Sequence, residues 1–351
     1  MSTTTMTPLP LEGSFPQGLQ PFPMPDAEYI FKRNKAKSRN RHLLVASAAS
    51  ITAMCLLAFV IFHGYVAWML AYPFVAPLKS NPQEAIGVAY ENVVFPSKSG
   101  NTTVSGWYIP ADTDGGEKAE SQRTVVFSHG YGANREENWV PMYELSKLLH
   151  GLNYNILMFD YGYASKEYKA PATGGLEESQ QLLAAVDYVK SRGAEDIVVW
   201  GFSMGAGTAL QAALQTGDID AMILDSLFIP SSKALFDNLN QFVTLPNFSL
   251  PMIESLIPLW TGSSFGSIPA QEVISHVYDI PLFIMHGTND VKAPYQTAEA
   301  VADSQGSPLS RTWIVPEGQH EMLFRAHPTE YIQRAALFLS QVDQQLQSDR
   351  A

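Results

Sequence analysis

The feature that most constrains the fold of this chain is a G-x-S-x-G motif that lies between an apolar run and a run of small residues. The apolar run, residues 197–200, is rich in β-branched side chains and predicts a buried strand, and the small residues that follow the motif predict a helix. Residues 201–205 are therefore expected to form a nucleophile elbow, a strained turn that exposes Ser203 at the carboxyl edge of a sheet. Ser203 is the candidate nucleophile.

The same five-residue pattern occurs a second time, at residues 262–266. A proline-containing segment precedes this second match, and neither a strand pattern nor a helix pattern flanks it. Because such a motif is meaningful only in a strand-turn-helix context, we interpret residues 262–266 as a glycine/serine loop.

Length, charge and cysteine content limit the remaining possibilities. A chain of 351 residues with 46% apolar residues can bury a large core, which favours one large α/β domain with additions. The formal net charge is −12, of which residues 1–72 carry +3, so the remainder carries −15 and is unsuited to nucleic acid. The single cysteine, Cys55, excludes an intramolecular disulfide, and no His/Asp cluster has the spacing of metal ligands.

An apolar segment near the N-terminus predicts a transmembrane helix over residues 43–72. Residues 43–62 contain no charge, and 20 residues in a helix span about 30 Å, the thickness of a hydrocarbon core. Tyr65, Trp68 and Tyr72 are suited to an aromatic belt at the far end. A cleaved signal peptide is disfavoured, because the charged and apolar regions are long and no small-x-small cleavage site follows promptly.

Six cations precede this segment, so the positive-inside rule predicts the orientation of the protein. Residues 1–42 are expected to be a disordered, basic, cytoplasmic tail. The body of the chain is then expected on the periplasmic or extracellular side of the membrane.

Beyond a linker at residues 73–86, strand and helix patterns alternate through a catalytic domain over residues 87–351. A hairpin is expected first, followed by six strands with helices between them, which predicts a mainly parallel sheet covered on both faces. The strand patterns cover residues 88–95, 102–109, 124–128, 155–160, 197–200, 222–225, 282–285 and 312–315, and the clearest helices cover 176–192 and 329–347. Residues 229–280 interrupt the alternation with five prolines, which predicts a small cap insertion or, alternatively, an ordinary crossover with a long loop.

A serine nucleophile needs a base, and the base needs an acid that fixes its tautomer. In the order that the elbow predicts, Asp290 follows the strand at 282–285 and His320 follows the strand at 312–315. Asp225 is the alternative acid. His327 is the rival base, although its place before Pro328 at the start of the last helix favours a capping role.

Attack on a carbonyl also requires donors for the developing oxyanion. The backbone N–H of Met204, beside the nucleophile, is one expected donor. The loop at residues 128–134 follows an early strand, and Gly130 permits a tight turn that would direct the N–H of Tyr131 into the site. The alternative interpretation of Gly130 is an ordinary turn without a catalytic role.

Together these segments resemble the α/β-hydrolase superfamily, in particular its membrane-anchored or exported serine esterases and acyl hydrolases. The resemblance covers residues 88–346 and rests on five motifs in order, at residues 129–132, 159–162, 201–205, 286–290 and 318–320. It implies an eight-stranded sheet, no cofactor, and the roles already given to Ser203, Asp290 and His320. The chain reads His-Gly-Tyr-Gly where many lipases have His-Gly-Gly-Gly, and serine at position 203 excludes the aspartate nucleophile of related dehalogenases.

The leading hypothesis is a single-pass, membrane-anchored serine hydrolase that cleaves a small-molecule or lipid-like carboxylic ester or thioester through an acyl-enzyme. An acyltransferase with the same triad is one alternative, because the sequence does not decide whether water or an alcohol accepts the acyl group. A non-catalytic envelope protein that retains the fold is the other alternative.

Overall fold

The computed structural model describes residues 26–351 apart from 112–120, 138 and 242. The chain divides into two compact units, Met1–Val60 and Ile61–Ala351, and the second contains the whole sheet. The tail expected at residues 1–25 lies outside the described residues.

Helix α1 (Ala27–Ala71) is longer than the predicted transmembrane segment. It includes residues 27–42, so the expectation of a disordered tail is wrong for this part of the chain. The physical reason is composition, because no glycine or proline occurs between residues 27 and 63 and the basic residues are good helix formers. Among the described helices, α1 alone is long and apolar enough to cross a membrane.

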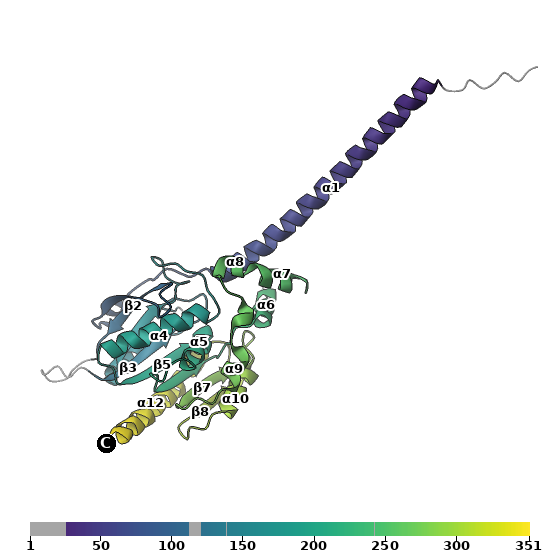
Figure 1. Cartoon of the computed structure of the whole chain (residues 1–351). Coiled ribbons are helices and arrows are strands. Elements are labelled where there is room, and N and C mark those ends of the chain that lie inside the picture. Colours follow the sequence, from purple (N-terminus) through teal and green to yellow (C-terminus); the bar gives the residue numbers. More distant parts are fainter. Residues whose placement is uncertain (1–25, 112–120, 138, 242) are drawn as a thin grey trace, which may run out of the picture. The chain divides into compact units, whose positions relative to one another are not determined.

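The described strands form one eight-stranded sheet with helices on both sides, as the sequence predicted (Figure 1). The sheet order is β1-β2-β4-β3-β5-β6-β7-β8, in which β1 and β2 are antiparallel to their neighbours and the rest are parallel. The strands are β1 (Glu91–Pro96), β2 (Thr103–Ile109), β3 (Arg123–Ser128), β4 (Asn155–Asp160), β5 (Asp196–Phe202), β6 (Ala221–Asp225), β7 (Leu282–Gly287) and β8 (Arg311–Val315). The carboxyl ends of the parallel strands therefore meet at one edge.

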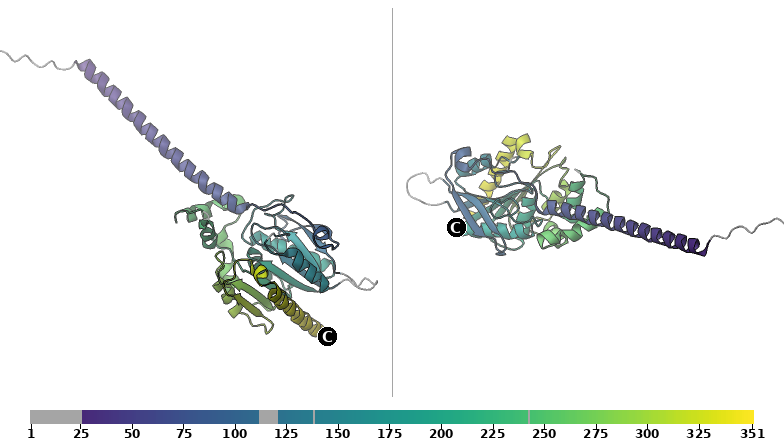
Figure 2. Two further views of the ribbon diagram at one scale, coloured as in Figure 1. Left: turned by 180° about the vertical axis from the view of Figure 1, so that it is seen from behind. Right: turned by 90° about the horizontal axis from the view of Figure 1, so that it is seen from above.

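Two helical layers cover the sheet, one on each face (Figures 1 and 2). One layer contains α4 (Leu176–Ser191), α5 (Met204–Ala213) and α10 (Tyr295–Asp303), and its core includes Val126 and Val199. The other contains α3 (Met142–Gly151) and α12 (Pro328–Arg350), and its core includes Val125 and Trp200. Successive strand residues enter opposite cores, which is why the strands read as continuous apolar runs.

The connection from β6 to β7 holds the cap insertion predicted at residues 229–280, and it is helical. Its elements are α6 (Ser232–Asn240), α7 (Ser249–Leu256), α8 (Pro258–Thr261), the 3-10 turn η1 (Phe265–Ser267) and α9 (Ala270–Ser275). The second G-x-S-x-G match lies here without a flanking strand, although one-turn helices border it. In a different part of the chain, the linker at residues 73–86 ends in a short helix, α2 (Pro82–Ile86), and the side chain of Asn81 caps the N-terminus of this helix.

Glycines at both ends of the first motif allow strand β5 and helix α5 to approach their neighbours. A Cβ at Gly201 would lie 2.6 Å from the Cα of Ala206. A Cβ at Gly205 would overlap the backbone carbonyl groups of Ser128 and His129. These neighbours are backbone atoms, which cannot move as a flexible side chain can.

We predict that Gly205→Ala lowers the melting temperature of the protein, because relief of the overlap requires displacement of β3 from α5. Overpacking of this kind costs about 1–3 kcal/mol or more. Gly151→Ala is the matched control, since a Cβ at this helical glycine has nothing within 4 Å. Thermal unfolding followed by tryptophan fluorescence measures both variants, and equal melting temperatures would refute the prediction.

Candidate active site

Ser203 lies between β5 and α5 in a strained backbone conformation, as a nucleophile elbow requires. Its φ of 50° and ψ of −119° are unfavourable for a residue with a side chain. Its N–H donates to the carbonyl of Asp225 at 2.9 Å, and its carbonyl accepts the N–H of Phe228 at 3.1 Å. These hydrogen bonds to the segment at the end of β6 hold the turn.

Two loops from neighbouring strands bring an acid and a base to this serine. His320 Nε2 lies 2.8 Å from Ser203 Oγ, and His320 Nδ1 lies 2.6 Å from Asp290 Oδ2. The loops are joined by the N–H of Asn289, which donates to the carbonyl of Gly318 at 3.0 Å. The three side chains predicted from sequence are therefore brought together in hydrogen-bond contact.

The rival acid and base have other partners. The carboxylate of Asp225 accepts hydrogen bonds from Tyr331 Oη at 2.8 Å and from Ser226 Oγ at 2.9 Å. The ring of His327 contacts Trp313, and its side chain makes no capping hydrogen bond to α12. The expected capping role of His327 is therefore wrong, although the residue does precede the helix.

The two expected oxyanion donors have backbone N–H groups that are not taken by other acceptors. Met204 is the first residue of α5, so its N–H has no intrahelical acceptor. Within the described part of the chain, no hydrogen bond uses the N–H of Tyr131. A Cβ at the adjoining Gly130 would lie 3.4 Å from the Cβ of Ser203, so this loop packs directly against the nucleophile.

His129 fixes the loop that carries Tyr131. Its Nε2 accepts the N–H of Tyr161 at 3.1 Å, so its Nδ1 carries the proton and donates to the carbonyl of Gly130 at 2.9 Å. Burial lowers the pKa of His129 to about 4, which keeps the ring neutral. His129 is thus a structural residue of the loop.

A cavity of about 250 Å³ opens onto Ser203 and His320. Its wall contains both apolar and polar residues, which suits a molecule with an acyl group and a polar head. The other lining residues are Leu70, Tyr131, Phe228, Leu235, Asn238, Leu239, Gln241, Lys292 and Glu321. Among the described residues, no group of three or more His, Cys, Asp or Glu could hold a metal ion.

Comparison with known proteins assigns the family. The model of the alpha/beta hydrolase family matches residues 125–271. The uncharacterized protein YfhR of Salmonella typhimurium is 30% identical over 246 residues, which are 66% of this chain and 74% of that protein. The chain belongs to the alpha/beta hydrolase family.

Two further comparisons concern proteins with named activities. The Pyrococcus furiosus esterase Pf2001 is 23% identical, with a TM-score of 0.60 over 77% of this chain and 98% of the esterase, and it shares the fold. The lysophosphatidylserine lipase ABHD12 of Macaca fascicularis is 25% identical over 187 residues. This match covers 51% of the hydrolase chain and 44% of the lipase.

Asp290 of this hydrolase is held as a carboxylate by partners that sequence reasoning identified only in part. Burial by itself would raise the pKa of Asp290, but hydrogen bonds from His286, His320 and the N–H of Ala293 outweigh it and hold that pKa well below its ordinary value. His286 Nε2 lies 3.1 Å from Asp290 Oδ2. The place of His286 four residues before Asp290 in the sequence is a signal that could have suggested this contact.

The sequence also contained no indication of a buried pair of carboxyl groups beside the candidate active site. Glu137 and Glu321 both have side chains against Gly130, where a Cβ would lie 3.1 Å and 2.6 Å from their Oε1 atoms. Neither oxygen of Glu137 has a donor among the described residues, whereas Glu321 Oε2 accepts the indole N–H of Trp139 at 2.5 Å. Burial and the neighbouring Glu321 raise the pKa of Glu137 well above its ordinary value. This shift favours the protonated form of Glu137 over a wider pH range than for an exposed glutamate.

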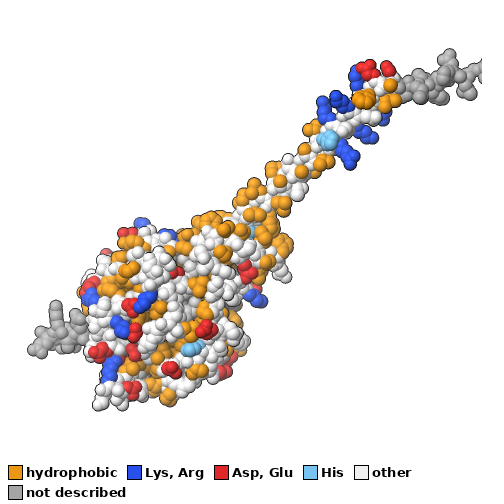
Figure 3. Space-filling view, viewed as in Figure 1, with side chains coloured by type: hydrophobic (Ala, Val, Ile, Leu, Met, Phe, Trp, Pro, Cys, Tyr) orange, Lys and Arg blue, Asp and Glu red, His pale blue; other side chains and the backbone are white. Residues whose placement is uncertain are grey.

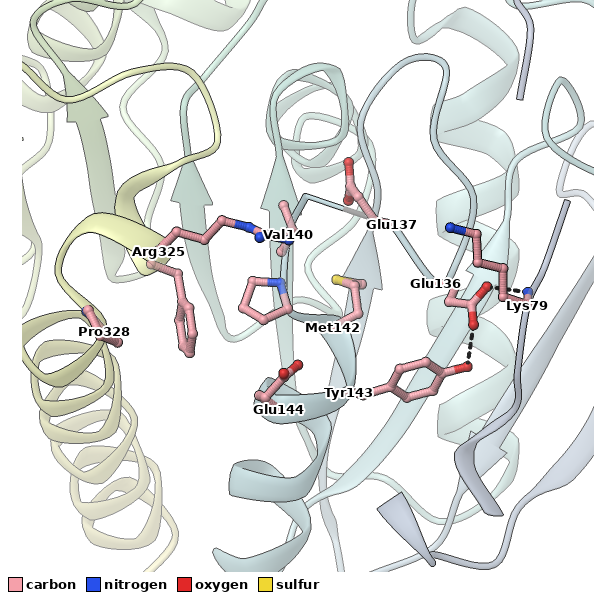
Figure 4. A pocket seen from close by; sticks show the side chains of 11 residues that line it. Lys79, Glu136, Glu137, Val140, Met142, Tyr143, Glu144, Arg325 and Pro328 are labelled. Atoms are coloured by element: carbon pink, nitrogen blue, oxygen red, sulfur yellow. Dashed lines mark hydrogen bonds between the residues drawn. The ribbon is translucent and has the colours of Figure 1, made fainter. Parts of the chain in front are cut away.

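A larger cavity of about 580 Å³ lies on the Glu137 side of this pair (Figure 4). Glu136 lines this cavity and accepts hydrogen bonds from the backbone N–H of Lys79 at 2.6 Å and from the hydroxyl of Tyr143 at 3.1 Å. Neither Ser203 nor His320 lines this larger cavity, so it is distinct from the candidate active site. The carboxyl pair separates the two cavities, since Glu137 lines one and Glu321 lines the other.

We predict that the Glu137→Gln variant gains stability relative to the unsubstituted protein as the pH rises, so that the difference in free energy of unfolding between the two proteins grows with pH. The unfolded chain releases the Glu137 proton near the ordinary pKa of 4.5, whereas the folded protein retains it. The free energy of unfolding of the unsubstituted protein therefore falls by up to about 1.4 kcal/mol per pH unit. The fall begins above the pKa of the unfolded chain and ends at the pKa of Glu137 in the folded protein. Glutamine has no such proton and still offers Glu321 a donor.

Melting temperatures of both proteins between about pH 5 and pH 8 measure this linkage, and the difference between them should grow with pH. Glu144→Gln is the control, because this exposed carboxyl group lines the same cavity. A difference that stays constant with pH would mean that Glu137 is ionised in the folded protein.

Proposed function

We propose that this chain is a membrane-anchored serine hydrolase that cleaves a carboxylic ester or thioester through an acyl-enzyme. The observation that carries the proposal is the continuous chain of hydrogen bonds from Ser203 Oγ through His320 to Asp290, with distances of 2.8 Å and 2.6 Å. A serine hydroxyl gains nucleophilic reactivity when an adjacent base of this kind accepts its proton.

In the proposed first half-reaction, His320 Nε2 takes the proton of Ser203 as Oγ attacks the carbonyl carbon. Asp290 stabilises the imidazolium that forms and keeps the Nδ1 proton directed toward itself. The negative charge on the carbonyl oxygen is received by the N–H groups of Met204 and Tyr131. His320 then protonates the leaving alcohol or thiol, and the acyl group remains on Ser203.

In the second half-reaction, water replaces the leaving group. His320 accepts a proton from the water while its oxygen attacks the acyl carbon, and the same two N–H groups receive the oxyanion. Collapse of the tetrahedral intermediate returns the proton to Ser203 Oγ and releases the acid. No cofactor takes part in this cycle.

Two observations support an ester with an acyl chain as the substrate class. The cavity beside Ser203 has Leu70, Phe228 and Leu235 in its wall. In addition, one relative carries the name lysophosphatidylserine lipase. The polar lining residues Lys292 and Gln241 would contact the polar head group of the substrate.

The proposed topology rests on the apolar helix and its flanking charges. Residues 43–72 were predicted to cross the membrane, but residues 63–71 of the helix pack against the catalytic unit, so the crossing segment is the uncharged stretch 43–62. The basic residues that precede it remain in the cytoplasm, and the catalytic domain at residues 87–351 lies on the opposite side. The linker at residues 73–86 joins the two, and the cap insertion covers the site.

We predict that Ser203→Ala abolishes both labelling by a fluorophosphonate probe and hydrolysis of p-nitrophenyl esters. Loss of the nucleophile in a triad lowers kcat by about 10⁶. Gel fluorescence of the labelled protein and release of p-nitrophenol measure the two effects.

The control is Ser264→Ala, which removes the exposed serine of the second G-x-S-x-G match. This variant should retain full labelling and activity. Labelling that survives in Ser203→Ala but disappears in Ser264→Ala would reverse the assignment, and an unsubstituted protein that reacts with no serine-directed probe would favour a non-catalytic role.

We predict that Asp290→Asn and Asp225→Asn have very different effects on turnover. The first should lower kcat by about 10⁴, because the amide no longer fixes the tautomer of His320. The second should affect stability more than kcat, since Asp225 is bonded to Tyr331 and Ser226. Steady-state kinetics with one soluble ester compares them, and a larger kcat loss in Asp225→Asn would identify Asp225 as the acid.

A further inference from the structure

The cap insertion has a surface that is unusual for such an acidic protein. Residues 238–271 contain a single charged residue, Glu254, in a chain with net charge −12. On α7, α8 and the preceding turn, large apolar side chains face outward, and the hydrophobic side chains gather in this region in Figure 3. Phe248 is 57% exposed, Leu259 73% and Trp260 42%. An apolar surface of this kind indicates an interaction site.

This surface is attached to the end of the apolar helix α1. Trp260 Nε1 donates to the carbonyl of Gly64 at 3.2 Å, and Ser249 Oγ lies 2.9 Å from His63 Nε2. Val66 and Ala67 belong to one buried cluster with residues of α6 and α7. Residues 63–67 follow the uncharged segment 43–62 directly. The cap insertion is therefore fixed at the point where the chain would leave a bilayer.

The catalytic cavity extends toward the same surface. Leu70, Leu235 and Leu239 line the cavity at Ser203, and they also line a small apolar void of about 10 Å³ that Ile253 of α7 and the adjoining Ile257 help to form. The cavity at Ser203 has a volume of about 250 Å³, below the range of about 300–1,000 Å³ for drug-sized ligands, which favours one acyl chain over two. The apolar wall beside Ser203 is therefore shared by α1 and the cap insertion.

We infer that the outer surface of α7 and α8 docks on a lipid bilayer, from which a single-chain lipid ester passes to Ser203 along the wall that contains Leu70. The inference rests on the proposed function and on its membrane anchor. A bilayer is favoured over a second copy or a protein partner because the surface continues the apolar helix and contains an interfacial tryptophan. Because Glu254 is the single charged residue of residues 238–271, the surface also meets less repulsion at anionic lipids than an acidic surface would.

The docking is tested with full-length protein in lipid nanodiscs. In a Cys55→Ser background, Leu259→Cys is labelled with an environment-sensitive fluorophore, and quenching by phospholipids with a nitroxide on the acyl chain is measured. Leu337→Cys is the matched control, because Leu337 of α12 is a 60% exposed leucine outside the cap insertion. We expect several-fold stronger quenching at position 259. Equal quenching at the two positions overturns the docking and assigns the surface to another occupant.

A second arm measures substrate delivery with Leu259→Glu. Its turnover of a single-chain lipid ester in the nanodisc should fall at least tenfold, whereas p-nitrophenyl acetate, which reaches the site from water, should be hydrolysed normally. Leu337→Glu should change neither rate. Loss of both activities, or of neither, in Leu259→Glu overturns delivery from the bilayer. Failure of the unsubstituted protein to hydrolyse either ester would instead refute the proposed function, and the quenching result would stand independently.

Discussion

The backbone of Ser203 is the constraint on which the site depends. A residue with a φ of 50° and a ψ of −119° persists only where its surroundings hold it, and here the hydrogen bonds to Asp225 and Phe228 do so. Gly205 then allows α5 to lie against the end of β3, so that the loop after β3 reaches the nucleophile. Strand, helix and oxyanion loop are therefore positioned by one turn, and a change in this turn affects all three.

The sequence was sufficient for the strands and for the residues in contact with Ser203. All eight strand patterns correspond to strands, and the inner parallel strands were recognised because strands buried on both faces are continuous apolar runs. Asp290 and His320 were identified because they lie in the loops that follow two of the strands. The prediction of disorder is wrong for residues 27–42, because a segment without glycine or proline readily extends an existing helix.

Contacts between distant loops could not be obtained in the same way. Glu137 and Glu321 are far apart in sequence and meet only because both carboxyl groups lie against Gly130. Nothing in their local sequence distinguishes them from exposed glutamates. Leu70 is a similar case, because its segment predicts a membrane helix but gives no sign that its side chain lines the cavity at Ser203.

The buried carboxyl pair bears directly on how His320 is oriented. Glu321 Oε2 lies 3.9 Å from His320 Nε2, the atom that faces Ser203, whereas Asp290 contacts Nδ1. An ionised Glu321 would place a negative charge on the Nε2 side of the ring, where it would compete with Asp290 for an imidazolium. Burial raises the pKa of Glu321 and so disfavours this competing charge. Asp290, whose pKa is held well below its ordinary value, is the carboxylate that contacts Nδ1 and orients the ring.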